Sequence, residues 1–145
     1  MSIFKDKEGC CEATFRSDGP YWHAYTSGKE TPLLFACRED LVFVMNVVAQ
    51  AATLFPEVRI IAFEVMNNHF HFVVSAEENS VLAFWAFIRK RLARLFPLMK
   101  GLQVTLKPIE DLGSLRNNIV YTNRNGYVAD PAHTPFSYPW GTGRY

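Results

Sequence analysis

Alternating apolar and polar positions predict a β-hairpin in the middle of the chain. Residues 58–65 read VRIIAFEV and residues 69–75 read HFHFVVS, and both stretches are rich in the aromatic and β-branched residues that favour strands. The dipeptide Asn67-Asn68 between them tolerates the positive φ angles of a tight hairpin loop. We therefore expect two antiparallel strands joined by a two-residue turn.

One register of this hairpin separates its side chains by polarity. If Asn67 and Asn68 form the loop, Glu64 lies directly opposite His71, and directly opposed residues share a face of the sheet. A shift of one residue would mix the apolar and polar sets, so the pattern itself favours this register. The expected apolar face is Phe63, Val65, Phe70, Phe72 and Val74, and the expected polar face is Glu64, Met66, His69, His71 and Ser75.

Helical periodicity appears on both sides of the hairpin. A segment opened by Pro32 keeps apolar residues at helical spacing until Pro56 ends it. A second helix is expected to be capped by Asn79 or Ser80 and to end near Pro97. The predicted buried positions are Leu41, Val44, Val48, Ala51, Ala52 and Phe55 in the first helix, and Val81, Phe84, Trp85, Ile88, Leu92, Leu95 and Phe96 in the second.

Two further strands and a last helix complete the predicted fold. Strands are expected at residues 21–26 and 103–107, and a helix is expected from the capping residue Asp111 to about Tyr127. This order predicts an α+β fold, a ferredoxin-like split βαβ sandwich whose antiparallel sheet carries helices on one face, with an added C-terminal helix. At 145 residues we expect one domain, with residues 1–20 as a flexible or loosely packed leader.

Composition indicates an ordinary globular protein. The net charge is +1, which does not by itself indicate a nucleic-acid partner. The three cysteines, Cys10, Cys11 and Cys37, have no metal-ligand spacing, and their usage favours a reduced, cytoplasmic compartment. The longest apolar run, residues 41–55, is too short to span a bilayer, so we expect no membrane partner.

The hairpin also carries chemistry. His69 and His71 stand two residues apart on one strand, so their imidazoles lie side by side and could bind one divalent metal ion. Glu64, opposite His71, could orient that imidazole as a hydrogen-bond acceptor or bind the metal itself. An isolated pair of this kind more often lies on a wet sheet face or forms local hydrogen bonds, and that interpretation stays open for the motif alone.

The last predicted helix carries a second unusual pair. Leu112, Leu115 and Ile119 fall together as its core stripe, whereas Tyr121 falls almost opposite them, among polar residues. Asn125 follows Tyr121 by one turn, so a hydroxyl and a carboxamide share one side of the helix. The pair could supply a nucleophile and an oxygen ligand.

Together these motifs resemble the single-tyrosine HUH transposases, which include the REP-associated tyrosine transposases. The shared features are a His-hydrophobe-His motif after a Met-x-Asn turn, at residues 66–71, and a downstream Tyr-x-x-x-Asn helix, at residues 121–125. The resemblance covers residues 22–130. Asn67 stands where many members have proline, and Gly126 stands where many have Asn-Pro after the tyrosine turn.

The resemblance implies an activity and roles for single residues. His69, His71 and Asn125 would bind Mg²⁺ or Mn²⁺, and Tyr121 would attack DNA to give a 5′-phosphotyrosine link that a second 3′-OH can rejoin. The family acts on single-stranded DNA, often beside a hairpin. Dimeric relatives make a homodimer an open alternative, with Tyr121 supplied in cis or by a partner.

Basic residues give candidate DNA contacts, although most such residues are simply solvated. No acidic residue occurs between Asn79 and Ile109. Other interpretations also stay open: a catalytically silent DNA-binding protein of the same fold, a metal-binding domain with unrelated chemistry, or a relaxase or replication initiator, which usually has a longer chain. The predicted phosphate contacts are Arg89, Lys90, Arg91, Arg94, Arg116 and Arg124.

Overall fold

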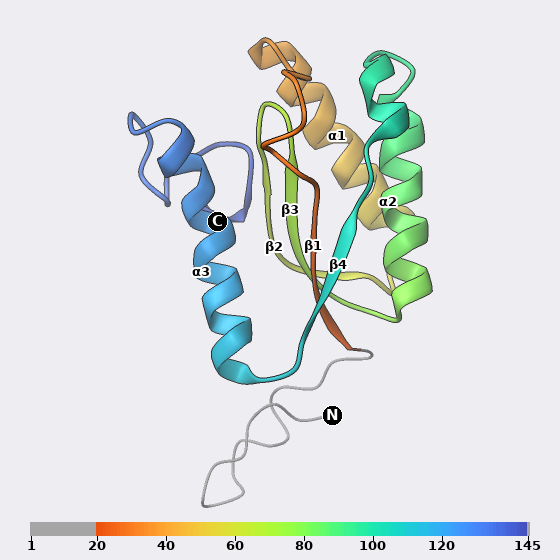
Figure 1. Cartoon of the computed structure of the whole chain (residues 1–145), viewed down its shortest axis with the longest axis vertical. Coiled ribbons are helices and arrows are strands. Elements are labelled where there is room, and N and C mark those ends of the chain that lie inside the picture. Colours follow the sequence, from red (N-terminus) through yellow and green to blue (C-terminus); the bar gives the residue numbers. More distant parts are fainter. Residues whose placement is uncertain (1–19, 145) are drawn as a thin grey trace, which may run out of the picture.

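The sheet has the strand order and directions of a ferredoxin-like fold. The computed structural model describes residues 20–144, so the leader predicted at residues 1–20 lies outside the described residues except for Pro20. All strand pairs are antiparallel, in the order β2-β3-β1-β4 (Figure 1). The elements are β1 (Tyr21–Tyr25), α1 (Arg38–Leu54), β2 (Arg59–Val65), β3 (Phe70–Ser75), α2 (Glu78–Leu92), η1 (Pro97–Gly101), β4 (Thr105–Ile109), α3 (Leu112–Ala129) and η2 (Thr142–Arg144). The predicted α+β fold is confirmed.

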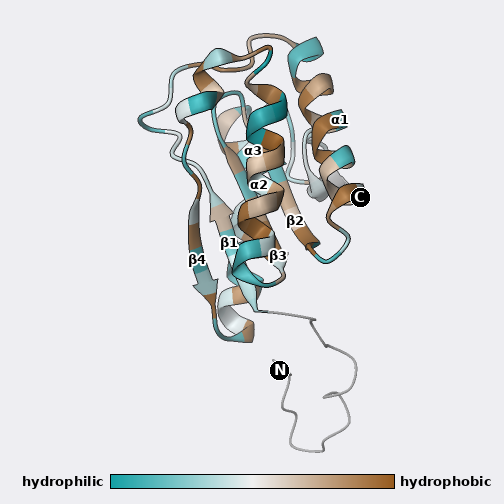
Figure 2. Cartoon of the chain, turned by 90° about the vertical axis from the view of Figure 1, so that its right-hand side faces the viewer, coloured by the Kyte–Doolittle hydropathy of each residue, from teal (hydrophilic) through white to brown (hydrophobic). Residues whose placement is uncertain are grey.

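Helices cover both faces of the sheet. Figure 1 shows α1 and α2 on one side and α3 on the other, and Figure 2 shows hydrophobic and hydrophilic positions alternating along α2 where it lies over the sheet. The larger core lies between the sheet and α1 and α2, and it includes Phe70 and Phe72. A smaller core lies under α3, where Leu115 packs with Ala62 and Val73. The added C-terminal helix therefore has a sheet face to itself.

The predicted hairpin register is confirmed. Glu64 pairs with His71 across β2 and β3, and the N–H of Met66 donates to the carbonyl oxygen of His69 at 2.8 Å. The two predicted faces follow from this pairing, because the apolar face meets α1 and α2 while the polar face meets α3. Between Ile60 and Ala62 the pairing shifts by one residue.

Both of the first two helices begin elsewhere than predicted. α1 begins at Arg38, after an extended Cys37, and the N–H groups of Ala36 and Cys37 both donate to the carboxylate of Asp40. α2 begins at Glu78 and has no side-chain cap, so the caps predicted at Asn79 and Ser80 are wrong. The predicted stripe of α2 holds through Leu92, where the helix ends; Leu95 is exposed and Phe96 is half-buried. In α1, Ala52 is exposed although it was predicted to be buried, and Val47 is buried although it was not predicted.

The fourth strand lies two residues later than predicted. It spans Thr105–Ile109 and so includes Pro108, which pairs with Trp22 of β1. A strand at the edge of a sheet tolerates proline, because its N–H groups on the outer side have no strand to bond to. Pairing with β1 therefore determines where this strand begins and ends, whereas the alternation of polar and apolar residues at 103–107 does not.

The C-terminal residues run along the other edge of the sheet. The N–H of Val65 donates to the carbonyl oxygen of Trp140 at 2.8 Å, and Gly141 bridges to Glu64. Thr142 bonds both to Phe63 of β2 and to Asn123 of α3. This segment thereby fastens the second half of α3 to β2. Among residues 20–144, none of the helices combines the length and apolar character that a membrane span requires.

Candidate active site

Two imidazoles lie together on the sheet face that α3 covers. The ring centroids of His69 and His71 are 5.0 Å apart and their planes stand at 82°. His71 is buried and His69 is half-buried. The strand geometry therefore brings the two predicted ligands side by side, at a place that is partly open to solvent.

The loop after β1 holds His69 in place. The side-chain N–H₂ of Asn68 donates to the carbonyl oxygens of Gly28, at 2.9 Å, and Thr31, at 2.8 Å. Its carbonyl oxygen is therefore free to accept, and it lies 2.6 Å from Nδ1 of His69. Since Nδ1 must be the donor in that pair, Nε2 of His69 keeps its lone pair.

His71 has a partner that the sequence motifs did not single out. Nε2 of His23, on β1, lies 3.1 Å from Nδ1 of His71, and the two rings stack with centroids 5.3 Å apart. Burial, and then the nearby Lys107, lower the pKa of His23 to about 4. Burial, followed by the charges of His69 and His23, lowers the pKa of His71 to about 3. Both imidazoles are thus neutral near pH 7, and a neutral imidazole is the form that binds metal ions.

The ring of Tyr121 lies over the imidazoles of His71 and His23. Its ring meets that of His71 edge-on with centroids 5.6 Å apart, and that of His23 with centroids 6.1 Å apart. Leu115, earlier in α3, packs against the sheet. The helical spacing predicts Tyr121 almost opposite this apolar stripe, yet the structure places its ring beside two imidazoles of the sheet. The tyrosine is 53% exposed, so its hydroxyl group remains accessible to a substrate.

Asn125 lies one turn beyond Tyr121 and is half-buried. Its N–H₂ group donates to the carbonyl oxygens of Tyr121, at 3.0 Å, and Thr122, at 3.4 Å. This orientation leaves the carboxamide oxygen unused in these bonds. No hydrogen bond links Asn125 to His69 or His71 within residues 20–144.

Glu64 forms a different hydrogen bond from the one that was expected. Its Oε2 accepts a hydrogen bond at 2.8 Å from the N–H of Gly126 in α3, and its Oε1 has no partner among the described residues. The carboxyl group is fully buried, and burial raises its pKa to about 7. Glu64 therefore bonds to the helix that carries Tyr121, whereas the ring nitrogen that it was expected to orient in His71 is taken by His23.

The predicted ligands have donor types that suit a divalent metal ion. Two imidazole nitrogens, from His69 and His71, and one neutral oxygen, from Asn125, would be a set that suits Mn²⁺ and, with added water, Mg²⁺. No cluster of three histidine, cysteine, aspartate or glutamate side chains suited to a metal occurs within residues 20–144. Any metal bound here would therefore need the amide oxygen or water to complete its ligands.

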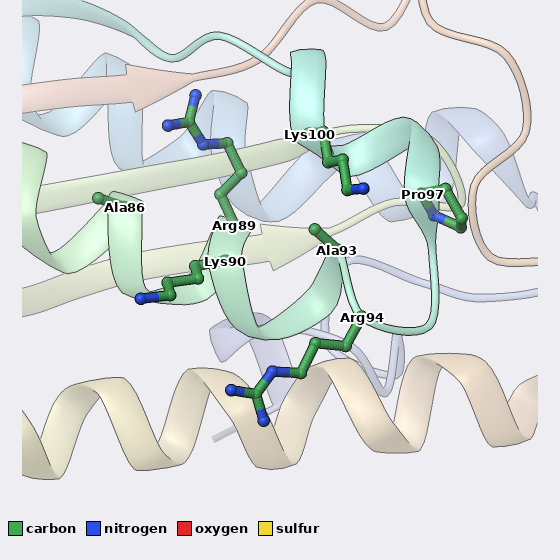
Figure 3. A pocket seen from close by; sticks show the side chains of 7 residues that line it. All are labelled: Ala86, Arg89, Lys90, Ala93, Arg94, Pro97 and Lys100. Carbon is green, nitrogen blue, oxygen red and sulfur yellow. The ribbon is translucent and has the colours of Figure 1, made fainter.

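The predicted DNA contacts fall on two sides of the sheet. Arg89 and Lys90 of α2 and Arg94, just after the end of that helix, line a hollow together with Lys100 of η1 (Figure 3). Arg91 is also exposed on α2, whereas Arg116 and Arg124 are exposed on α3, across the sheet (Figure 1). The six residues therefore form two basic surfaces, of which only the one on α3 shares a helix with Tyr121.

Comparison with known proteins supports the fold. Neither a protein-family model nor a curated protein sequence matches the chain. A REP-associated tyrosine transposase, solved bound to a REP hairpin, superposes with a TM-score of 0.68 at 15% identity, covering 98% of this chain and 82% of that one. A candidate transposase from Deinococcus radiodurans R1 gives a TM-score of 0.48 at 15% identity over 77% of this chain and 94% of the other, which is too low to support an argument. The chain thus has the fold of the REP-associated tyrosine transposases, the family that its motifs resemble.

Proposed function

We propose that the protein is a metal-dependent endonuclease and strand transferase that acts on single-stranded DNA through Tyr121. The observation that carries the proposal is the position of the Tyr121 ring over His71 and His23 within one chain. A phenol, two neutral imidazoles and a carboxamide are the groups that such a reaction needs, and here they come from α3, from β3 and from the residue directly before β3.

The reaction conserves the energy of the bond that it breaks. The hydroxyl oxygen of Tyr121 attacks phosphorus, the bond between phosphorus and the 3′-oxygen breaks, and the 3′-oxygen leaves with a proton as a free hydroxyl. The phenol proton can pass to water, because Tyr121 is half exposed. A second 3′-OH can then attack the 5′-phosphotyrosine and displace the tyrosine, so that cleavage becomes strand transfer without an added energy source.

Mg²⁺ or Mn²⁺ would be held by His69, His71 and Asn125, and when bound it would supply charge that polarises the scissile phosphate. Other residues of the chain orient these two histidines. Asn68 and His23 hold the two imidazoles at their Nδ1 atoms. The fold of α3 keeps Tyr121 facing them.

The proposed substrate is single-stranded DNA beside a hairpin. The structural relative was solved with a REP hairpin, which supports this class of ligand for the same fold. Arg116 and Arg124 on α3 would contact phosphates near Tyr121, whereas Arg89, Lys90 and Arg94 would contact a more distant part of the DNA. A DNA-binding protein that does not cleave is the second candidate, and the basic hollow on α2, which does not depend on Tyr121, favours it.

A covalent-adduct assay separates the two candidates. The protein is incubated with end-labelled single-stranded hairpin DNA and Mn²⁺, and adducts that survive SDS are counted on a gel. Tyr121→Phe should abolish the adduct while DNA binding persists. Tyr25→Phe is the matched control, because Tyr25 also stacks near His23 and His71 and carries the same hydroxyl group. DNA binding without an adduct across varied hairpins would support the non-cleaving candidate, and an adduct that depends on Tyr25 would overturn the choice of nucleophile.

A further inference from the structure

The contact between His23 and His71 joins two imidazoles at the centre of the sheet. His23 lies on β1 and His71 on the neighbouring β3, and their side chains share the face covered by α3. His23 is only 7% exposed and His71 only 5%, so water cannot readily replace either partner. Both rings are also confined by stacking, with planes 18° apart. The pair is therefore a fixed part of the sheet.

A hydrogen bond between two neutral imidazoles requires one donor and one acceptor. If Nε2 of His23 donates, Nδ1 of His71 is the acceptor and Nε2 of His71 carries a proton, so it cannot bind a metal. If Nδ1 of His71 donates, Nε2 of His71 keeps its lone pair. The direction of this one bond at 3.1 Å therefore decides whether His71 can be a ligand.

The neighbouring histidine shows which direction suits the site. Asn68 fixes His69 with its proton on Nδ1 and its lone pair on Nε2. Two ligands to one ion need the same arrangement, and histidines that bind metals almost always donate their other N–H to an acceptor nearby. His23 is the group beside Nδ1 of His71 that can accept.

We propose that His23 is a positioning residue of the metal site: by accepting a hydrogen bond from Nδ1–H of His71, it keeps Nε2 of His71 unprotonated and directed for metal binding. This inference rests on the proposed function, in which His71 is a metal ligand. His23 occupies for His71 the place that Asn68 occupies for His69. The site thus depends on two neighbouring strands, because β1 supplies the hydrogen-bond partner of a histidine on β3.

NMR of the metal-free protein tests the direction of the bond without any DNA. Long-range ¹H–¹⁵N correlations should show His71 protonated at Nδ1 and unprotonated at Nε2, with Nε2 of His23 unprotonated. In His23→Phe, which keeps a ring for stacking but has no acceptor, His71 should exchange between both tautomers. Finding His71 protonated at Nε2 in the wild-type protein would overturn the proposal.

Mn²⁺ binding to the protein alone gives a second readout. We expect His23→Phe to bind Mn²⁺ about 10- to 100-fold more weakly, the usual effect of losing such a partner, whereas His23→Gln, which keeps an acceptor oxygen, should stay near the wild-type affinity. Tyr25→Phe, beside the same rings, should change neither the tautomer nor the affinity. Unchanged Mn²⁺ affinity in His23→Phe would also overturn the proposal.

Failure of this inference and failure of the proposed function look different. A wild-type protein with the expected tautomers but no covalent DNA adduct would refute the cleavage activity alone. An adduct-forming protein whose His71 is protonated at Nε2 would refute the positioning role alone. If His23→Phe does not fold, as judged by its circular dichroism, the wild-type tautomers and the His23→Gln affinity still decide the matter.

Discussion

Glu64 gives the sharpest test of the packing between α3 and the sheet. Its carboxyl group is fully buried between β2 and α3, where it accepts one hydrogen bond, from the N–H of Gly126, and has an oxygen without a partner. A buried carboxylate with one hydrogen bond is poorly compensated for the loss of water. The perturbation that we choose is Glu64→Gln, because it keeps the shape and an acceptor for Gly126 but cannot ionise.

The size of the effect follows from the two pKa values. Burial raises the pKa of Glu64 from 4.5 to about 7, and a difference of about 2.5 at about 1.36 kcal/mol per pKa unit amounts to about 3 kcal/mol. An acid whose pKa is raised in the folded state favours folding in its protonated form. Its contribution is therefore fully present below pH 4.5 and is lost as the pH rises to about 7.

Urea unfolding measured from pH 5 to pH 8 gives the assay. The buried histidines act in the opposite direction, because their pKa values are lowered and their contribution is lost as the pH falls below 6.5. Both proteins contain them, so subtracting the two curves removes them. The free energy of unfolding of the wild-type protein minus that of Glu64→Gln should fall by about 2–3 kcal/mol between pH 5 and pH 8.

A difference curve that stays flat across this range would refute the reasoning, because Glu64 would then titrate alike in the folded and unfolded protein. Glu110→Gln is the matched control. Glu110 is exposed just before α3, so this change should leave the pH dependence of stability as it is in the wild-type protein.

Three other substitutions test the packing around the site. Gly28→Ala places a Cβ 2.7 Å from Nδ1 of His69 and should displace that imidazole. Titration should then show Mn²⁺ binding weakened about tenfold or more, with little change in the thermal midpoint of unfolding. An Mn²⁺ affinity equal to that of the wild-type protein would contradict this placement. Gly126→Ala places a Cβ 2.2 Å from the ring of Tyr138 and should destabilise the protein by about 1–3 kcal/mol in urea unfolding, whereas a neutral effect would mean that the ring does not pack there. Leu115→Ala should cost about 2–5 kcal/mol in the same assay, and a loss under 1 kcal/mol would show that this residue does not anchor α3.

The hairpin could be predicted from the sequence because two constraints coincide in it. Alternation assigns each residue to a face, and the turn at Asn67-Asn68 fixes which residues oppose each other. His69 lies directly before β3 and His71 lies within it, so their proximity depends on local geometry alone. The position of Tyr121 did not follow in this way, because the helical spacing places it almost opposite the apolar stripe of α3, whereas its ring lies beside His71 and His23.

His23 could not be found in this way, because its contact with His71 depends on which strands are neighbours. The placement of β1 beside β3 is a property of the whole sheet, and one histidine in an aromatic strand carries no local signal of it. The same limit explains β4, whose bounds are set by pairing with β1 and not by its own alternation. The role of Glu64 was hidden for a related reason, since its partner is a backbone N–H in a helix more than 60 residues away. The polar alternation of β2 gave no means of predicting that partner.

The segment around Trp140 and Gly141 has a consequence for contacts between molecules. It occupies the outer side of β2 at residues 63–65, so these backbone groups are not available to a strand of another chain. At the opposite edge, Pro108 of β4 lacks the N–H that a regular added strand would need. A regular strand added from another molecule would therefore meet an obstacle at each edge of the sheet, at residues 63–65 of β2 and at Pro108 of β4.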